Sequence, residues 1–407
     1  MHATDDRQAA QRTPPGAAPV VPRDTPERTA NQPFGRGIVL YDFLHCRGGA
    51  ERVTLDLARG TGADVGVAFR RLSEFPDATL AEIACREFLP AWAPQPERLK
   101  AMLSLLGFRH RAGAIADYDW AVFSGSTTPA AWRYRPAGGN LYYCHTIPRL
   151  AYDLYDWYRD RLPRWQRPAF AALAGVIRQS YAEGMGHMDR VLANSETVRA
   201  RLAHYLGIDA QVVWPPCDTG AYAWTGQDGY YLSTARLEPF KRVDAIVEAF
   251  RRLPGKRLVV ASGGSDAARL RALAADAPNI TFVGWQDEAA FRRLVGSAIA
   301  TVYVARDEDF GMSPVESMAA GKPVIAVREG GLRETVVDGE TGLLLDPPPT
   351  GAAIAAAVGA LPPERAASMR AACEARAGLF GRERFLQTMQ RHIGEVASAH
   401  ARSRELQ

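Results

Sequence analysis

The residues best suited to chemistry lie in the stretch RDEDFGMSPVESMAAGKPVIA, residues 306–326. Asp307, Glu308 and Asp309 form an acidic triplet, and Glu316 follows Glu308 after seven intervening residues. Such a triplet can hold a divalent cation, but hard cations take several oxygen ligands. A glycine turn follows the triplet at once, and no further acidic or histidine cluster is nearby. The pattern therefore favours a site without a metal ion, with a metal held by Asp307 and Asp309 as the weaker alternative.

A second interpretation of Glu316 is purely structural. Ser313 could cap a helix, with Pro314 at its first position, where the missing N–H costs nothing. Glu316 would then stand at the third position and complete a capping box with Ser313. The helix would end at Gly321, a favourable residue after a helix C-terminus. This interpretation explains Glu316 but leaves Glu308 unexplained.

A third interpretation is a ligand site that uses both glutamates. Glu308 is expected near a strand end and Glu316 near the following helix start, so both would face the same edge of a sheet. The N–H groups of the first helical turn attract an anion, and a carboxylate can bind the hydroxyls of a ribose. The residues expected to approach such a ligand here are Phe310, Gly311, Met312, Ser313 and Val315.

Two cations follow the strand-like run YYLSTA. Arg236 and Lys241 could together bind a diphosphate, with the guanidinium as a fork and the ammonium as a point charge. Alternatively, they belong to a solvated basic loop with Arg242, because charged runs are usually at the surface. The two glutamates in the same half of the chain favour the diphosphate site.

Glycines and single polar or aromatic residues stand at other predicted strand ends. Gly48 and Gly49 follow the first predicted strand, and Gly263 lies in VVASGGSDAARL, which lacks the G-x-G-x-x-G spacing. His145 follows the strand NLYYC, where a lone histidine is more often a packing residue. Trp285, in FVGWQDEAAF, suits either a base contact or packing. Ser195 is expected to cap the helix ETVRARLAHYL.

The elements that must position these residues alternate between strand and helix. One βα series precedes the Pro- and Gly-rich stretch WPPCDTGAYAWTG, and another begins near Gly229. This alternation predicts an α/β protein with two doubly wound, largely parallel sheets. We expect a disordered tail over 1–34, one domain over 35–215 and a second over 216–370. Helices over 371–407 are expected to cross back to the first domain.

Composition narrows the functional classes. The chain has 407 residues, 47% of them hydrophobic, and a net charge of +4, which is too small to indicate nucleic-acid binding. Its five cysteines are scattered without a CxxC pair, so neither a zinc knuckle nor a disulfide framework is predicted. The N-terminal stretch lacks the apolar core of a secretory signal. We therefore expect a cytoplasmic protein.

Taken together, these motifs resemble the retaining glycosyltransferases of family 4, which have the GT-B fold. The spacing of Glu308 and Glu316 is similar to the family's E-x7-E motif. STARLEPFKRVDAIVEAF, VLANSETVRARL and GKPVIAVREGGLRETVVDGETGLLL resemble other family segments, so the likeness covers about residues 36–350. The segment CHTIPR departs slightly from the commoner His-Thr/Ser-Pro-Pro-Arg form.

The resemblance implies a role for each motif. Arg236 and Lys241 would neutralise the departing nucleoside diphosphate, Glu308 would contact the donor sugar, and Glu316 would hold the ribose. His145 would contact the transferred sugar, and Arg149 and Asp153 would lie on the acceptor side. The remaining donor-binding residues would be Gly48, Gly49, Gly263, Trp285, Phe310, Gly311, Met312 and Ser313. No cofactor or metal would be required.

The implied reaction moves a sugar from a nucleoside diphosphate to a saccharide or polyprenyl-linked saccharide, with retention of configuration. The CHTIPR segment favours GDP-mannose as donor, with a UDP-sugar as the alternative. A sugar-nucleotide epimerase of the same fold, an oxidoreductase and a non-catalytic sugar-binding subunit remain alternatives. Two basic amphipathic stretches, residues 97–115 and 157–179, suit either an anionic membrane on the inner face of the plasma membrane or packing within their own domain.

Overall fold

The first seven strands form one parallel sheet, and its central strands are apolar and buried on both faces, as in sheets covered by helices on either side. In the computed structural model the strand order is β3-β2-β1-β4-β5-β6-β7. The strands are β1 (Gly37–Tyr41), β2 (Asp64–Val67), β3 (Cys85–Glu87), β4 (Trp120–Phe123), β5 (Asn140–Cys144), β6 (Arg190–Ala193) and β7 (Gln211–Val212). The structure describes residues 34–45, 48–89 and 99–405, and the predicted disordered tail over 1–34 lies almost wholly outside them.

The second sheet repeats this arrangement with six parallel strands in the order β10-β9-β8-β11-β12-β13. Its strands are β8 (Tyr230–Ser233), β9 (Arg257–Val260), β10 (Ile280–Phe282), β11 (Thr301–Tyr303), β12 (Val324–Val327) and β13 (Gly342–Leu345). In both sheets all strands are parallel, but the order in which the chain adds them reverses. The reversal point lies between β1 and β4 in the first sheet and between β8 and β11 in the second. In open sheets of this kind, ligands bind beyond the carboxyl ends of the strands at that point of reversal.

Helices connect the strands and cover the sheets. Those of the first half are α1 (Gly49–Thr61), α2 (Lys100–Arg111), α3 (Tyr155–Arg161), α4 (Arg167–Met185) and α5 (Glu196–Leu206). Those of the second half are α6 (Val243–Arg251), α7 (Ala267–Leu273), α8 (Glu288–Ser297), α9 (Met312–Ala319), α10 (Leu332–Thr335) and α11 (Gly351–Ala360). The chain closes with α12 (Pro363–Ser368), α13 (Arg370–Gly378) and α14 (Arg382–Glu405). Within the described ranges, no helix is both long enough and apolar enough to cross a membrane.

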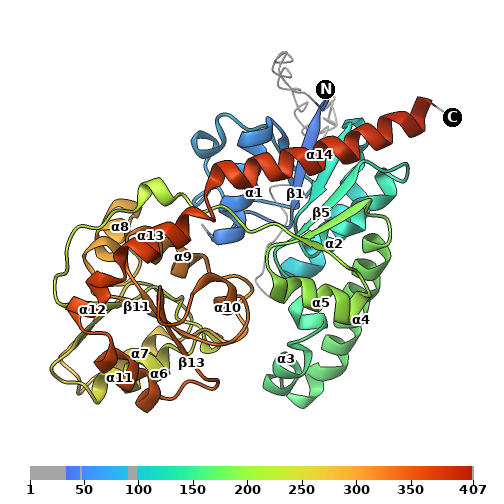
Figure 1. The fold of residues 1–407 in the computed structure, drawn as a ribbon. Helices are drawn as coiled ribbons and strands as arrows, with labels where there is room; N and C mark the ends of the chain where they lie inside the picture. The colour runs from blue at the N-terminus through green and yellow to red at the C-terminus, as the bar shows by residue number, and fades with distance from the viewer. Residues whose placement is uncertain (1–33, 46–47, 90–98, 406–407) are drawn as a thin grey trace, which may run out of the picture. The chain divides into compact units, whose positions relative to one another are not determined.

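The last helix returns to the first sheet. Figure 1 shows α14 beside α1, and it also packs against β4 and β5. Phe385, Met389 and Ile393 enter the same buried cluster as Val39 of β1 and Val122 of β4. Because these apolar residues recur every three or four positions, one face of α14 completes the cover over the first sheet.

The predicted α/β class with two doubly wound parallel sheets is confirmed. The second sheet follows the βα series predicted from Gly229 onward. The pattern missed β3 and β7, which have only three and two residues, and the one-turn helix α10. Elements this short leave no periodic signal, because periodicity needs several repeats to be visible.

Candidate active site

A largely buried ion pair lies beyond the carboxyl ends of β8 and β11. The ammonium of Lys241 lies 2.5 Å from Oε2 of Glu308 and donates a second hydrogen bond of 3.1 Å to the hydroxyl of Tyr303. Tyr303 in turn donates to the same carboxylate oxygen at 3.0 Å. The three groups therefore form a closed triangle of charge-assisted hydrogen bonds.

Both members of this pair are held in their charged forms. Burial by itself would lower the pKa of Lys241, but the adjacent Glu308 carboxylate and Tyr303 raise it above its ordinary value. Burial would likewise raise the pKa of Glu308, but Lys241 outweighs it and lowers the pKa. Each charge thus compensates for the desolvation of the other, so a fixed positive and a fixed negative charge stand at the strand ends.

Arg236, the other predicted diphosphate ligand, lies in a different environment. Its side chain is exposed, whereas Lys241 is only 8% exposed. Among the described residues, none forms a hydrogen bond or ion pair with its guanidinium. The loop that carries it is nevertheless fixed, because the N–H of Glu238 donates to the carbonyl of Arg236 at 2.8 Å. Arg236 therefore presents an uncompensated positive charge from the loop that also supplies Lys241.

Glu316 is paired across the two halves of the chain. Arg52, near the start of α1, donates a 2.6 Å hydrogen bond to Oε1 of Glu316. The Glu316 side chain is 4% exposed and that of Arg52 is 47% exposed. The carboxylate is thus buried beneath a half-exposed guanidinium, and any ribose that bound Glu316 would have to displace or share Arg52.

The capping-box interpretation of Glu316 is wrong. The helix begins at Met312 with Gly311 as its N-cap, and no side chain caps it. Ser313 is therefore inside the helix, and Glu316 lies too far along it to reach back to the first turn. A glycine is needed at position 311 because φ is +94° there and a Cβ would lie 2.8 Å from Leu332. The helix N-terminus is consequently free of side-chain caps, as an anion site requires.

Gly49 and Phe310, both predicted to lie near a donor, differ in what they can present to a ligand. A Cβ at Gly49 would lie 2.6 Å from the sulfur of Met312, so the α1 and α9 N-termini approach closely. Phe310 was expected to approach a donor, but its ring is 3% exposed and packs 5.4 Å from that of Phe380 in the core of the second half. Only the backbone of Phe310 can therefore face a ligand.

Gly263 and Trp285, both predicted to bind the donor, lie against each other. A Cβ at Gly263 would lie 2.5 Å from Nε1 of Trp285, so only glycine lets the indole lie against this loop. The Trp285 side chain is 69% exposed. Packing therefore explains one edge of the ring, while its remaining surface is open to a planar ligand.

His145 is a neutral histidine at the end of β5. Burial lowers its pKa to about 4. Its Nε2 lies 2.9 Å from the hydroxyl of Ser124, and the rings of Tyr41 and Tyr143 lie edge-on to it. Asn194 fixes the backbone by donating to the carbonyl of His145 at 2.8 Å. The imidazole can thus orient a hydroxyl but is uncharged at neutral pH.

The neighbours of His145 and Glu308 are hydrogen-bonded to each other. Thr146 donates to Oδ1 of Asp309 at 3.1 Å, and Ser195 donates to the Asp309 carbonyl at 2.5 Å. Ser195 also accepts from the N–H of Val198, which confirms that it caps α5. Asp309 thereby ties the carboxyl ends of β5 and β6 to the loop that carries Glu308.

Arg149 and Asp153, which were predicted on the acceptor side, belong to the network of contacts around Asp309, here called the Asp309 junction. Arg149 donates to Asp153 at 2.7 Å and to the carbonyl of Asp307 at 3.1 Å. Arg201 of α5 pairs with Asp309 and lies 3.6 Å from Asp153. The sequence prediction overlooked that residues four positions apart can form an ion pair, as Arg149 and Asp153 do. Together they stabilise the Asp309 junction.

The acidic triplet does not act as one cluster. Glu308 pairs with Lys241, Asp309 pairs with Arg201, and Asp307 lies 3.9 Å from Arg306. In the part of the chain that the structure describes, no group of three histidine, cysteine or acidic residues is arranged to hold a metal ion. Each carboxylate is thus committed to a different cation.

The site contains residues that the sequence patterns missed. Arg52 lies three positions after Gly49, and Tyr303 ends β11; both contact a predicted glutamate. A charged residue in the turn after a glycine pair could have indicated Arg52. Nothing in the strand ATVYVA distinguishes Tyr303 from a core tyrosine.

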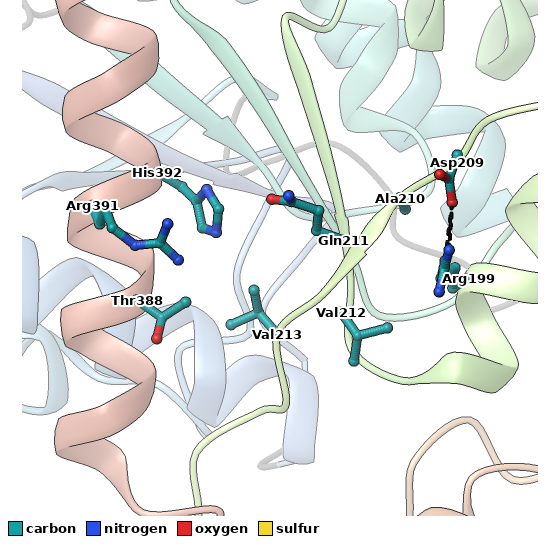
Figure 2. Close-up of a pocket in the computed structure, with 9 residues that line it drawn as sticks. All are labelled: Arg199, Asp209, Ala210, Gln211, Val212, Val213, Thr388, Arg391 and His392. Atoms are coloured by element: carbon teal, nitrogen blue, oxygen red, sulfur yellow. Dashed lines mark hydrogen bonds and ion pairs between the residues drawn. The ribbon is translucent and has the colours of Figure 1, made fainter.

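A hollow of about 490 Å³ opens elsewhere, between β7 and α14. Figure 2 shows Thr388, Arg391 and His392 on the α14 side and the ion-paired Arg199 and Asp209 at the other end. None of its lining residues is a predicted site residue, so the hollow does not bear on the chemistry at Lys241.

Two family models match adjacent parts of the chain. Residues 47–220 match Glycosyltransferase Family 4, and residues 220–377 match Glycosyl transferases group 1. Each half of the chain thus resembles a glycosyltransferase domain. The first carries Gly49, Arg52 and His145, and the second carries Lys241 and both glutamates.

Curated relatives of these glycosyltransferase domains share part of the chain. The D-inositol 3-phosphate glycosyltransferase of Mycobacteroides abscessus is 32% identical over 163 residues, 37% of each chain. The enzyme of the same name from Segniliparus rotundus is 33% identical over 226 residues, 48% of this chain and 49% of the relative. The chain thus spans less than half the length of these relatives.

Solved structures agree in fold. Sucrose-phosphate synthase from Thermosynechococcus elongatus superposes with a TM-score of 0.73 at 20% identity, covering 89% of this chain and 100% of that one. Anabaena Alr3699/HepE, in complex with UDP and glucose, gives a TM-score of 0.68 at 17% identity, covering 88% and 98%. At these identities the likeness establishes the fold, and the predicted GT-B fold is confirmed.

Proposed function

We propose that this protein is a retaining glycosyltransferase that moves a sugar from a nucleoside diphosphate to a hydroxyl acceptor. The observation that carries the proposal is the buried Lys241–Glu308 pair, which lies inside the match to Glycosyl transferases group 1 and beyond the reversal point of the second sheet. A fixed cation there suits a leaving diphosphate, and a fixed carboxylate suits sugar hydroxyls.

The diphosphate would be stabilised without bond formation to the protein. Lys241, Arg236 and the uncapped N-terminus of α9 offer positive charge and N–H donors from one side of the second sheet. Charge develops on the departing phosphate oxygen as its bond to the sugar breaks. Preorganised donors aimed at developing charge are often the largest single catalytic contribution.

The transfer breaks the bond between the anomeric carbon and the phosphate oxygen and forms one from that carbon to the acceptor oxygen. The acceptor proton passes to the departing phosphate on the same face, so the anomeric configuration is retained. Glu308 would hold the sugar hydroxyls, and His145, neutral because burial lowers its pKa to about 4, would orient the sugar as a hydrogen-bonding group. No metal or cofactor enters this proposal.

Glu316 would bind the ribose of the donor. Its carboxylate is occupied by Arg52 at 2.6 Å, so the ribose would share or replace that hydrogen bond. Because Arg52 is half exposed, its guanidinium can turn toward the diphosphate without crossing the core. Donor binding would thus give Arg52 a phosphate partner and give Glu316 hydroxyl donors in place of the present ion pair.

The favoured donor is GDP-mannose, and the favoured acceptor is a saccharide or lipid-linked saccharide of cell-surface polysaccharide assembly. The alternative donor is a UDP-sugar, and HepE is a neighbour solved with UDP and glucose. Because the curated relatives are named D-inositol 3-phosphate glycosyltransferases, inositol phosphate is a further acceptor to test in the transfer assay.

A thermal-shift panel of GDP, UDP and ADP, followed by their sugars, tests the donor. We expect GDP to raise the melting temperature most and a Lys241→Ala variant to lose that rise. The preferred nucleotide-sugar is then incubated with each acceptor class, and product is detected by mass. Stabilisation by UDP alone would replace the donor assignment, and absence of transfer to any acceptor would count against the function.

The main alternative is a sugar-nucleotide epimerase, which acts on its donor without an acceptor. Incubation with nucleotide-sugar alone separates the two. Under the proposal, the sugar remains unchanged or is slowly hydrolysed. Accumulation of an epimerised nucleotide-sugar would overturn the transferase assignment.

A further inference from the structure

The segment from α3 to the first half of α4 packs little against the rest of the protein. No residue of α3 is buried, and the buried residues of α4 begin only at Ala174. Between the helices, in the turn Arg164–Gln166, the side chain of Trp165 is 78% exposed. A large aromatic ring in water forfeits its hydrophobic stabilisation, so this turn is poorly explained by packing.

The first half of α4, which follows Trp165 in the chain, also exposes apolar residues. Pro168, Ala169, Ala172 and Val176 are exposed and recur at helical spacing, opposite the buried Ala174 and Ile177. Val176 is 55% exposed. A helix with one apolar face on the core and another toward solvent lacks the usual polar outer side. We call Trp165 and these four residues the Trp165 face.

Three arginines border the Trp165 face without acidic partners. Arg159 pairs with both nearby acids, at 2.8 Å from Asp156 and 3.0 Å from Asp160. The remaining arginines of the segment are Arg161, Arg164 and Arg167, and among the described residues none forms an ion pair with them. Arg161 instead stacks over Trp157, at 3.6 Å from the ring centroid. Arg161 and Arg167 also donate to the backbone carbonyls of Trp157, Leu162 and Asp160. These carbonyls do not neutralise the guanidinium charges, which are therefore available to an external anion.

We infer that the Trp165 face, with Arg161, Arg164 and Arg167, docks on an anionic lipid surface. Tryptophan places an apolar ring and a polar N–H at the boundary between acyl chains and headgroups. Guanidinium groups bind lipid phosphates, and unpaired ones do so without first breaking an internal ion pair. The combination of apolar face and unpaired cations fits a membrane better than an acidic polymer, which has no use for the exposed ring.

The second stretch considered from the sequence does not share these properties. In α2, Leu105 and Phe108 are buried in the core of the first half, and Lys100 is 5% exposed. Residues 97–98 lie outside the described ranges. The part of that stretch within α2 is thus used for packing, and the inference rests on the Trp165 face alone.

The test uses the full chain and vesicles without any sugar substrate, so its result is independent of the proposed activity. Sedimentation is measured with phosphatidylcholine vesicles and with vesicles of phosphatidylcholine and phosphatidylglycerol in equal proportion. We expect binding to the second kind only, weakened by added salt because the Debye length shortens. The triple variant R161Q/R164Q/R167Q should bind about 100-fold more weakly, at roughly fivefold per arginine.

Matched variants separate location from net charge. R252Q/R293Q/R384Q removes the same charge from three exposed arginines elsewhere and should retain binding. Trp165→Ala should weaken it, whereas Leu72→Ala, at a residue 59% exposed outside this segment, should not.

If both triple variants lost vesicle binding equally, net charge alone would explain the binding, and the inference would be overturned. Absence of binding to either vesicle would do the same. A wild-type dimer in analytical ultracentrifugation that Trp165→Ala converts to a monomer would assign the Trp165 face to a second copy of the chain instead.

Discussion

At the residue scale, the defining feature is a lysine and a glutamate that are buried together. Lys241 and Glu308 lower one another's desolvation cost, and Tyr303 bonds to both. A buried pair of this kind gives little net stability, but removing one partner leaves an unpaired charge. The Lys241–Glu308 pair is therefore better explained by a need for fixed charges at the strand ends than by a contribution to folding stability.

Replacing Lys241 with alanine should reduce kcat by roughly 100-fold or more, because a donor to the developing phosphate charge is lost. Steady-state transfer assays measure this effect, with Arg252→Ala as an exposed control. Since the substitution also leaves Glu308 unpaired, folding is checked by the melting temperature. Near-normal turnover in the folded variant would remove Lys241 from the mechanism.

His145 should make stability depend on acid pH. Its pKa is about 4 in the folded protein, against 6.5 ordinarily, so the unfolded chain binds more protons between these values. Stability should therefore rise as pH rises from about 4 to 6.5. Urea unfolding at about pH 5 and about pH 7 should show this rise in the wild type and a smaller one in His145→Gln. Equal slopes in both proteins would contradict the assignment.

At the element scale, the N-termini of α1 and α9 meet. Gly49 leaves room for Met312, and Arg52 reaches Glu316. The absence of a side chain at Gly49 therefore sets how closely the helices approach, and the ion pair closes the contact. Both helices start at the reversal point of their sheets, where ligands bind in this architecture.

A double-mutant cycle on Arg52 and Glu316 should show coupling. Arg52→Ala leaves a carboxylate that is 4% exposed without its partner, which should cost about 1–3 kcal/mol of unfolding free energy. Glu316→Gln in the Arg52→Ala background should recover part of that loss because the buried charge is gone. Denaturant unfolding of the four proteins measures the coupling, and strictly additive effects would refute it.

At the scale of the whole molecule, the two halves are joined through their strand ends. Asp309 links to Thr146, Ser195 and Arg201. The carboxylate of Glu334 in α10 likewise accepts the first N–H groups of α5, including that of Glu196 at 2.8 Å. The contacts of Asp309 involve the loop that carries Glu308, so a change in them would move the Glu308 carboxylate.

A chelator should leave turnover largely intact, because the proposed charge stabilisation comes from Lys241, Arg236 and helix N–H groups. Transfer is measured after treatment with EDTA and after readdition of Mg²⁺ or Mn²⁺. Strong loss that either ion restores would support the metal interpretation of Asp307 and Asp309 and replace this part of the mechanism.

Much of the fold was predictable because it follows from local patterns. The alternation of apolar runs and amphipathic segments predicted both sheets, and the spacing of Glu308 and Glu316 predicted the family. The pattern around Ser313 failed because Gly311, not Ser313, caps α9. Phe310 and Arg149 were both assigned to ligands. In the structure the ring of Phe310 packs against Phe380, and Arg149 bonds to Asp153 and to the carbonyl of Asp307.

Local patterns in the sequence were enough to predict the α/β class, the resemblance of both domains to glycosyltransferases, and the residue types of the candidate site. Periodicity and short motifs are local properties of a chain. Only the tertiary structure decided the partners. Arg52 pairs with Glu316 across 264 positions, and Thr146 bonds to Asp309 across 163. The choice of partner for a buried charge depends on which segments folding brings within hydrogen-bond distance, and no local pattern encodes that distance.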